Sequence, residues 1–397
     1  MSKEKRRVPK LRFPGFTEDW EQRKFGEIMT FLNGRAYKQD ELLEDGKYKV
    51  LRVGNFYTND SWYYSDLELD DKYYAINGDL LYTWSATFGP HIWKGEKVIY
   101  HYHIWKLVLQ DKIDKLFALQ LLEVDKANIM SDKNGSTMVH ITKQGMENKQ
   151  TILPISLNEQ KQIAKFLSSM DKLITLHQRK LDNIKLKKKA LLQKLFPKNG
   201  ERYPELRFPG FTDAWEQRKL GDLYKRVNER NDGTLGRDKW ISVAKMYFQD
   251  PDKVQSNNLD TRTYVMKKGD IAFEGHPNNE FKFGRFVLND IGTGIISELF
   301  PIYRPITEYD LDFWKYAIQL ERVMAPIFAK SITSSGNSSN KLDHNHFLNQ
   351  ELLVPNIEEQ KKIGTLLSIL SKNITLHQRK LDHLQLQKKA LLQQMFV

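Results

Sequence analysis

The sequence contains no cysteine among its 397 residues. This absence excludes disulfide bonds, thiolate metal sites and cysteine nucleophiles. No apolar run approaches the roughly 18 residues that a membrane span needs. The charged segment 1–7 is not followed by the apolar core of a secretory signal. We therefore expect a cytoplasmic protein without a membrane partner.

Motifs of common enzyme classes are also missing. The sequence has no Gly-x-Gly-x-x-Gly or Gly-x-x-x-x-Gly-Lys-Ser/Thr phosphate loop and no His-Glu-x-x-His metal motif. It has no Asn/Asp-Pro-Pro-Tyr/Phe segment, with which a base-methylating enzyme would hold a flipped base. His101 and His103 flank Tyr102, and His344 and His346 have the same spacing, but a pair alone is a weak metal signal. We expect no catalytic residue, metal or cofactor in this chain.

Positive charge is abundant. Lysine and arginine number 62 against 50 aspartates and glutamates, which gives a formal net charge of +12. The isoelectric point is about 9.3. This balance is suited to a polyanionic partner such as nucleic acid, with a solvated basic surface as the alternative. A hydrophobic fraction of 40% and an aromatic fraction of 12% indicate globular domains, and the length allows two or three of them.

A long basic helix is predicted twice. Residues 174–182 and 188–193 recur unchanged as 374–382 and 388–393, at an offset of 200. In each copy, apolar residues follow alternating steps of four and three, which is the 3.5-residue period of a coiled-coil seam. One histidine and one lysine interrupt each seam, and a polar seam residue usually fixes register. The predicted seam residues are Ile163, Leu167, Met170, Ile174, His177, Leu181, Ile184, Leu191, Leu195, Ile363, Leu367, Leu370, Ile374, His377, Leu381, Leu384, Leu391 and Met395.

A second motif begins each half of the chain. Pro-Lys-Leu-Arg-Phe-Pro-Gly-Phe-Thr (9–17) with Trp-Glu-Gln-Arg-Lys (20–24) returns in nearly the same form at 204–212 and 215–219, at an offset of 195. Each half thus has a head motif, a variable region and a long helix, which indicates duplication of a large unit. We expect the head at Pro9 to lie beside the end of the second helix, because the first helix leads directly into the second head.

The variable regions, roughly 25–152 and 220–353, are predicted to be strand-rich. Runs of β-branched and aromatic residues between Gly, Asn and Asp predict strands at 49–53, 79–83, 97–100, 103–109, 240–243, 270–273, 284–288 and 294–297. Helices are expected at 115–124 and 311–324, with Pro326 ending the second. A proline then precedes each long helix, whose first turn contains a glutamate that the helix dipole favours.

The two variable regions share the position of a Gly-Asp motif and of a polar loop, but the residues around these features differ. Gly-Asp opens a strand at Asp79 and at Asp270, but the residues that follow differ, as do the polar loops around Gly135 and Gly336. Sequence-specific DNA binding needs such variation, with basic residues for phosphates and polar or aromatic residues for base edges. The candidates in the first region are Arg35, Lys38, Arg52, Asn55, Tyr57, Trp84, Ser85, Thr87, His91, Lys133, Asn134, Ser136 and Thr137. Those in the second are Arg237, Lys239, Lys245, Tyr247, Arg262, His276, Asn278, Asn279, Lys282, Arg285, Ser334, Ser335, Asn337 and Lys341.

Taken together, three features resemble the specificity subunits of type I restriction–modification systems. They are the Leu-Arg-Phe-Pro-Gly-Phe and Trp-Glu-Gln-Arg-Lys heads, the duplicated helix, and the helix starts in which Leu-Pro or Val-Pro is followed, after four or three residues, by Glu-Gln-x-x-Ile. The resemblance implies an α+β fold in which two long helices form an antiparallel coiled coil and join two mixed, strand-rich target recognition domains. It also implies a pseudo-twofold internal duplication. The expected parts are recognition domain 1 (1–157), helix 1 (158–197), recognition domain 2 (198–356) and helix 2 (357–397).

The resemblance also implies a function. Each recognition domain would read one half of a bipartite site in double-stranded DNA, and the coiled coil would set the unread gap and dock two methyltransferase subunits. Restriction subunits would then join. The partners would carry adenine-N6 methylation and ATP-dependent endonuclease activity, with S-adenosylmethionine, ATP and Mg bound to them. A helix of about 35 residues is roughly 50 Å long, which exceeds one DNA turn of about 34 Å.

Two other classes of protein remain open from the sequence. A self-sufficient nuclease or methyltransferase would show metal- or cofactor-dependent activity as a purified chain. A coiled-coil scaffold without DNA specificity would bind DNA with a steep salt dependence and no sequence preference. The diverged loops argue against the scaffold, and the missing motifs argue against the enzyme.

Overall fold

The computed structural model describes residues 7–57, 59–85, 87–131, 141–198, 200–254, 262–335 and 339–396. The chain forms two compact units. Unit 1 consists of Met1–Gln178 and Arg379–Val397, and unit 2 consists of Arg179–Gln378. The long helices α4 (Leu157–Lys194) and α9 (Ile357–Met395) each contribute one part to each unit. Within the described ranges, no helix is both long and apolar enough to cross a membrane.

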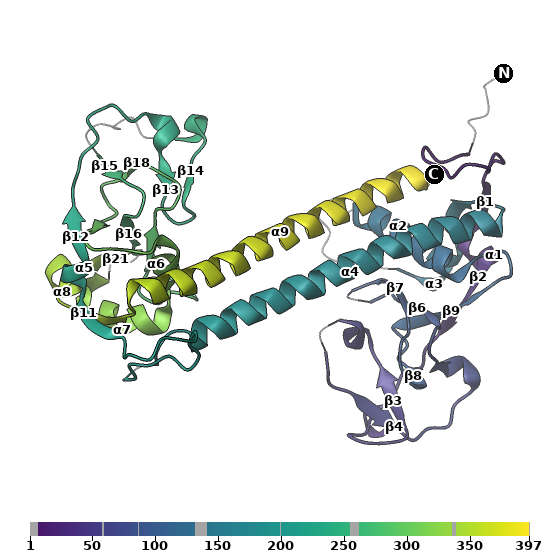
Figure 1. The fold of residues 1–397 in the computed structure, drawn as a ribbon. Helices are drawn as coiled ribbons and strands as arrows, with labels where there is room; N and C mark the ends of the chain where they lie inside the picture. Colours follow the sequence, from purple (N-terminus) through teal and green to yellow (C-terminus); the bar gives the residue numbers. More distant parts are fainter. Residues whose placement is uncertain are drawn as a thin grey trace. The chain divides into compact units, whose positions relative to one another are not determined.

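Unit 1 is built on two four-stranded sheets, with strand orders β2-β9-β6-β7 and β4-β3-β8-β5, and a separate β1-β10 pair (Figure 1). The strands are β1 (Glu21–Lys24), β2 (Met29–Asn33), β3 (Tyr48–Leu51), β4 (Tyr63–Ser65), β5 (Tyr74–Ala75), β6 (Leu80–Thr83), β7 (Gly89–Ile92), β8 (Val98–Tyr100), β9 (Ile104–Leu109) and β10 (Gln150–Leu153). The shorter helices are α1 (Phe25–Ile28), α2 (Lys115–Ser131) and α3 (Lys143–Asn148), with 3-10 turns at Gln39–Glu41, Val53–Phe56 and Asp71–Tyr73. All strand pairs are antiparallel except β3 with β8.

Unit 2 repeats the first sheet as β12-β19-β16-β17 and the head pair as β11-β22, while its other strands form the pairs β13-β14, β15-β18 and β20-β21. The strands are β11 (Glu216–Lys219), β12 (Tyr224–Val227), β13 (Ile241–Ser242), β14 (Tyr247–Phe248), β15 (Thr263–Met266), β16 (Ile271–Glu274), β17 (Arg285–Leu288), β18 (Gly294–Ser297), β19 (Ile302–Pro305), β20 (Ile332–Ser335), β21 (Asn340–Leu342) and β22 (Glu351–Val354). The shorter helices are α5 (Leu220–Leu223), α6 (Leu311–Ala317), α7 (Glu321–Ser331) and α8 (His344–Leu348), with 3-10 turns at Arg237–Lys239 and Pro251–Lys253.

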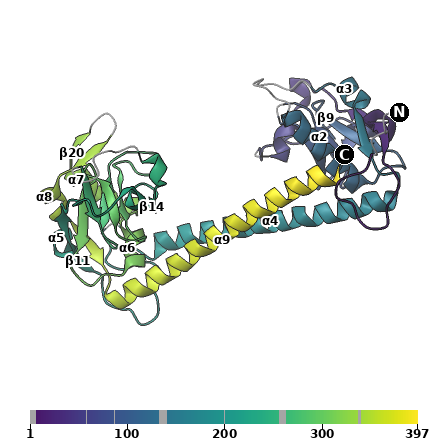
Figure 2. The ribbon, with the colours of Figure 1, turned by 90° about the horizontal axis from the view of Figure 1, so that it is seen from above.

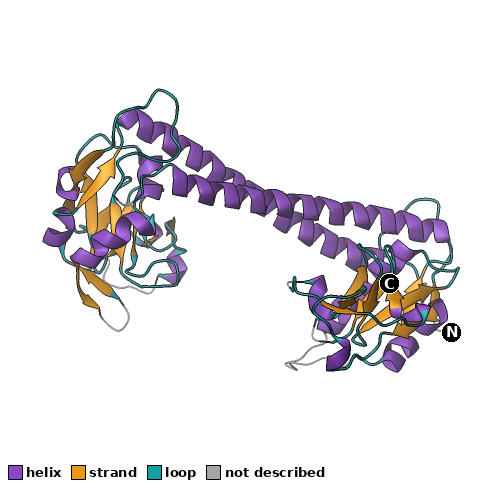
Figure 3. Cartoon of the chain, turned by 90° about the horizontal axis from the view of Figure 1, so that it is seen from below, coloured by secondary structure: helices purple, strands orange, loops and turns teal. Residues whose placement is uncertain are grey.

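The inner strands β6 and β16, which hold equivalent places in the two units, are buried on both faces. In β6, Leu80 and Tyr82 belong to the core that contains α2 and the start of α4, whereas Leu81 faces the second sheet. In β16, Phe273 packs with α6 and α7, and Ala272 faces the strands β13, β15 and β18. Figure 2 shows α6 and α7 beside the strands of unit 2. Because strand side chains alternate between faces, one strand serves both layers. Figure 3 shows the strands of each unit gathered with short helices and loops around them.

The long helices pack antiparallel within each unit. Leu167, near the start of α4, shares the core of unit 1 with Met395 at the end of α9. Leu367, near the start of α9, shares the core of unit 2 with Leu195, which follows α4. All the seam residues predicted from the 3.5-residue period are buried or half-buried. The fold is therefore α+β, with two strand-rich domains and an antiparallel helix pair.

Each head motif binds the end of the helix that comes from the other half of the chain. The Leu11 amide donates to the carbonyl of Gln394 at 2.9 Å, and the Phe396 ring packs edge-on against Trp20 at 6.3 Å. The expected position of the Pro9 head beside the end of the second helix is confirmed. The matching pairs in unit 2 are Leu206 with Lys194 at 2.9 Å and Phe196 with Trp215 at 5.7 Å.

The helix predicted at 311–324 is wrong in its bounds. Two helices occupy this stretch, and Pro326 lies inside α7 instead of ending it. The break comes earlier, at Ile318, where tight i to i−3 bonds close α6 and Leu320 becomes the N-cap of α7. Pro326 lies in the second turn of α7 on an exposed face, so it removes one backbone hydrogen bond without unfolding the helix. The helix predicted at 115–124 is confirmed and extends to Ser131.

Candidate nucleic-acid interface

A buried ion pair joins each head motif to the start of a long helix. The Arg12 guanidinium donates through Nε and Nη2 to the two carboxylate oxygens of Glu159 at 2.6 and 2.8 Å. The Glu159 side chain is 1% exposed, and its hydrogen bonds raise the pKa of Arg12. Arg207 and Glu359 repeat the pair, with both distances at 2.8 Å. The glutamate that the sequence assigns to the helix dipole thus also anchors the head.

An aspartate turn sets the first candidate loop in both units. Asp79 and Asp270 each precede a central strand, β6 or β16, and follow a glycine whose φ is +93° or +95°. Each aspartate forms an ion pair with the adjacent strand, Asp79 with Lys106 at 2.7 Å and Asp270 with Arg304 at 2.8 Å. The shared frame predicted from Gly-Asp is therefore a shared turn, from which β6 and β16 run to loops that differ.

In unit 1, aromatic rings gather where β6 ends. Trp84 stacks on Trp105 at 5.8 Å, meets His103 edge-on at 5.0 Å and donates from its indole nitrogen to the carbonyl of Tyr102 at 2.9 Å. Trp84 is half-buried, whereas Tyr102 is 39% exposed. Beyond Trp84, the predicted residues Ser85 and Thr87 are half-buried and exposed, respectively. Exposed aromatic faces suit stacking on bases and contact with thymine methyl groups.

Two predicted residues, Tyr57 and His91, touch each other. The Tyr57 hydroxyl lies 3.2 Å from His91 Nε2, and the His91 ring stacks on Phe56 at 4.2 Å. Thr83 Oγ1 lies 3.3 Å from the same nitrogen. Burial, reinforced by the positive charge of Lys126, lowers the pKa of His91 to about 4. His91 is therefore a neutral, packed ring, and the 43% exposed Tyr57 is the member of this pair that a ligand can reach.

The basic candidates of unit 1 are largely engaged within the domain. Arg35 makes a bidentate pair with Glu41 at 2.9 and 2.7 Å, and this pair lowers the pKa of Glu41 to about 2. The Arg52 guanidinium lies over the Tyr63 ring at 4.2 Å. Asn55 donates to two backbone carbonyls and accepts from the Arg52 amide. These contacts tie Asn55 to Arg52, Asn59 and Ser61, and Lys38 stays exposed.

In unit 2, a buried carboxylate organises the equivalent loop. Glu274 ends β16 and is 8% exposed; His276 Nδ1 lies 3.0 Å from one of its oxygens, and Arg285 Nε lies 3.2 Å from the other. Arg285 also donates to the carbonyl of Ala244 at 2.7 Å, at the β13-β14 turn. Three predicted segments therefore meet here, because the Asn340 amide of β21 donates to the Gly275 carbonyl at 2.9 Å.

The remaining candidates of unit 2 are exposed around this centre or farther along the chain. Tyr247 is 48% exposed on β14, and Arg262 pairs with Glu298 at 3.4 Å while remaining 70% exposed. Asn278 accepts the amides of Glu280 and Phe281 at 2.9 Å and so shapes its own loop. The exposed candidates that complete the set are Arg237, Lys239, Lys245, Asn279, Lys282 and Lys341.

Some candidates lie outside the described residues. These are Lys133, Asn134, Ser136 and Thr137 of the first region and Asn337 of the second. For Ser334 and Ser335, the structure describes the backbone of β20 but not the side chains. The predicted roles of all these residues stay predictions.

Sequence reasoning missed three residues that the structure places in these loops. Glu274 is the charged centre of unit 2, and Tyr102 and His103 lie against Trp84 in unit 1. Tyr102 lies between two histidines, a cluster of polar rings that could have been read as a contact surface. No local signal marks Glu274, because its burial depends on Arg285 from the neighbouring strand.

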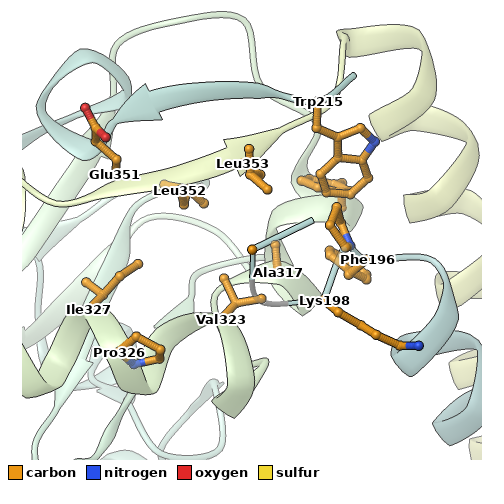
Figure 4. Close-up of a pocket in the computed structure, with 13 residues that line it drawn as sticks. Phe196, Lys198, Trp215, Ala317, Val323, Pro326, Ile327, Glu351, Leu352 and Leu353 are labelled. Carbon is orange, nitrogen blue, oxygen red and sulfur yellow. The ribbon is translucent and has the colours of Figure 1, made fainter. Parts of the chain in front are cut away.

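A metal centre is not found among the described residues, where no three His, Cys, Asp or Glu side chains converge. Unit 2 has an apolar pocket of about 360 Å³ between the segment that follows α4, helix α7 and strand β22 (Figure 4). Trp215, Val323, Ile327 and Leu352 line it, and its charged residues are Lys198 and Glu351. The described residues that line the pocket are mostly apolar, whereas a nucleotide site presents several convergent polar groups.

Residues 17–186 match the family model of the type I restriction modification DNA specificity domain. The type I restriction enzyme MjaVIII specificity subunit of Methanocaldococcus jannaschii is 25% identical over 412 residues, which cover 96% of this chain and 92% of that protein. In fold, the chain resembles the crystal structure of the type I restriction-modification system S subunit from M. genitalium. The TM-score is 0.60 at 15% identity, and 98% of this chain and 99% of that one are covered.

Proposed function

Because the chain belongs to the family of type I restriction–modification specificity subunits, we propose that its two units each read one half of a bipartite DNA site. Recognition of DNA sequence is the function of this family, and the two-part reading is our proposal. It rests on one observation above all. Both units have the same head pair, the same aspartate turn and the same four-stranded sheet, but they differ where the central strand meets its loop.

The difference at this position is chemical. The last residue of β6 is Thr83, which pairs across the sheet with Gly89. The last residue of β16 is Glu274, which pairs with Arg285. A neutral, aromatic surface and a charged one would contact different base edges, because each base pair shows its own pattern of donors and acceptors in the major groove. Two units with the same sheet framework and different loops are suited to two half-sites of different sequence.

We further propose that the long helices dock methyltransferase subunits. Each helix carries two leucines that are more than 60% exposed, and the four positions correspond after a shift of 200 residues. They are Leu176, Leu186, Leu376 and Leu386, exposed by 61, 67, 63 and 66%. Exposed leucines on a helix suit an apolar partner surface. Because the positions are duplicated, two methyltransferase subunits would bind, and restriction subunits would join the complex through them.

Catalysis is proposed to reside in these partners. Adenine-N6 methylation with S-adenosylmethionine and ATP- and Mg-dependent cleavage would be theirs, and this chain would supply the sequence preference. Incubation of the purified chain with DNA, S-adenosylmethionine, ATP and Mg should give neither methylation nor cleavage. Activity of the chain alone would contradict this part of the proposal.

The test is a genome-wide map of methylated adenines in cells that contain a cognate methyltransferase subunit with or without this chain. The expected result is a motif with two specified parts and a fixed gap, present only with the chain. Exchange of residues 220–353 for those of another family member should change one part and leave the other. A continuous motif would overturn the two-part reading, and sequence-independent DNA binding would favour the scaffold class.

A further inference from the structure

A buried carboxylate stands where the loop of unit 2 begins. Glu274 is the last residue of β16, and its side chain is 10% exposed. Carboxylates are rarely buried, because the lost hydration must be replaced by ion pairs and hydrogen bonds. The matching position in unit 1 is Thr83, so the shared framework does not require a charge there. The carboxylate is therefore one of the features by which unit 2 differs from unit 1.

Both oxygens of this carboxylate are fixed. One lies 3.0 Å from His276 Nδ1 and the other lies 3.2 Å from Arg285 Nε. Arg285 is itself held, by its bond to the Ala244 carbonyl at 2.7 Å and by the Phe281 ring 5.2 Å from its guanidinium. Because Arg285 is held from two sides, the carboxylate cannot turn away from His276 without breaking an ion pair.

The loop that carries His276 is also held in shape. A Cβ added to Gly275 would lie 2.2 Å from the Asn340 carbonyl oxygen, so strand β21 packs directly on the start of the loop. Asn278 closes the loop by accepting two backbone amides at 2.9 Å. A side chain on such a loop is preorganised, and it loses little conformational entropy when it binds.

His276 is exposed to solvent, unlike the packed His91 of unit 1. Its side chain is 58% exposed, although Nδ1 is bound to Glu274. His91, in contrast, is stacked on Phe56 and has Nε2 within reach of two hydroxyl groups. When Nδ1–H donates to a carboxylate, the neutral ring has its lone pair on Nε2, which then accepts a hydrogen bond.

Building on the proposed function, we propose that His276 reads one base of the half-site of unit 2 and that Glu274 is its positioning residue. The acceptor Nε2 matches the exocyclic amino group of an adenine or a cytosine, which are the hydrogen-bond donors of the major groove. Arg285 supports this contact through Glu274. Lys282 and Lys341, both exposed on the adjoining loop and strand, are placed to contact phosphates.

The first experiment maps methylated motifs for the chain in complex with its methyltransferase subunits. His276→Ala should remove the preference at one position of the half-site that the exchange of 220–353 assigns to unit 2, and the other half-site should stay unchanged. Glu274→Gln should relax the same position, and the double variant should add nothing further. His276→Gln keeps an acceptor atom and should keep part of the preference.

A matched control is His346 on helix α8, whose side chain is 61% exposed and whose Nδ1 lies 3.9 Å from Asp343, the N-cap residue of that helix. His346→Ala should leave the motif unchanged. If His276→Ala leaves the motif unchanged, or weakens methylation evenly at all positions, the proposal is overturned, because a purely structural role predicts the even loss. If the wild-type complex has no two-part motif, it is the proposed function that fails instead.

The second experiment identifies the base edge. DNA duplexes would carry, at the relaxed position, purine in place of adenine or 2-pyrimidinone in place of cytosine, each of which lacks the amino group. The wild-type complex should bind the analogue about tenfold more weakly than natural DNA, in line with the value of one base contact. The His276→Ala complex should show no such difference beyond the loss of base pairing. An equal loss in both complexes would overturn the assignment.

Discussion

At the residue scale, the heads of the two units are held by the same ion pair in different surroundings. Glu159 accepts a further hydrogen bond from the Trp20 indole nitrogen at 3.3 Å. The equivalent nitrogen of Trp215 is buried and has no hydrogen-bond partner among the described residues. The Glu359 carboxylate therefore depends more on its arginine for side-chain hydrogen bonds than the Glu159 carboxylate does.

This difference makes a prediction for two alanine variants. Arg207→Ala should destabilise the chain by about 3–5 kcal/mol, because it leaves a buried carboxylate without its partner. Arg12→Ala should cost less, since Trp20 still donates to Glu159. Calorimetric unfolding of the full chain measures both. Glu359→Leu combined with Arg207→Ala should recover part of the loss, and equal losses for the two single variants would contradict the role given to Trp20.

The packed histidine of unit 1 predicts a pH dependence. Because the folded pKa of His91 is lowered to about 4, the unfolded chain binds a proton first as the pH falls. The stability that the neutral ring contributes is present above the ordinary histidine pKa of about 6.5 and is lost as the pH falls from there toward 4. By pH 5 the loss should reach roughly 2 kcal/mol.

His91→Gln removes this titration and serves as its control. The unfolding temperature of the wild type should fall more between pH 7 and pH 5 than that of the variant, since both share the other titrating groups. If the unfolding temperatures of the two proteins fall in parallel with pH, His91 does not contribute to the pH dependence of stability.

At the scale of elements, the exposed leucines of the long helices can be tested without altering the seam. Leu176→Asp with Leu376→Asp should weaken binding of the methyltransferase subunits by tenfold or more, because burial of each leucine is worth roughly 1.5–3 kcal/mol. Gln193→Asp with Gln393→Asp, at exposed positions of the same helices, is the matched control. Copurification and titration measure the effect. Full binding by the leucine variant would exclude this docking surface.

The elements differ in how far the sequence predicts them. Helices α4 and α9 are predicted well, because a seam of period 3.5 that is kept over nine steps is compatible with few other structures. Each predicted strand overlaps an observed one, but short strands such as β1 and β11 are missed. The sequence Glu-Gln-Arg-Lys forms a strand only because β10 or β22 pairs with it from far along the chain. The position of Pro326 inside α7 is also not visible in the local sequence, because it depends on where the preceding helix α6 ends.

The candidate site was predictable as a region and not as a set of contacts. The Gly-Asp turn located the first loop in both units, since the turn chemistry is local. Which candidates are free to read a base depends on pairing across the sheet. Arg35 and Asn55 have side chains suited to contact with DNA, but the structure uses them inside unit 1. His276 has a suitable side chain too, and only its contact with Glu274 in the structure shows how it is held.

At the scale of the whole molecule, the proposed division of labour assigns spacing to the helices. A heptad that continues the seam could be inserted after Gln178 and after Gln378, which would lengthen each helix by about 10 Å. If the helices set the gap, the methylated motif should gain about 3 base pairs between its two parts. An insertion in one helix only would misalign the two seams and should abolish methylation. An unchanged gap with both insertions would refute the proposed spacing role.

Unit 1 is built from two stretches of chain that are made at different times. Its second stretch begins at Arg379, after all of unit 2, and supplies Phe396, whose ring stacks on Phe117 at 5.6 Å. On the ribosome, unit 2 can finish its core first, while unit 1 waits for its second stretch, which is synthesised after unit 2. A nonsense mutation shortly before Arg379 would therefore damage unit 1 rather than unit 2, although most of unit 1 precedes unit 2 in the sequence.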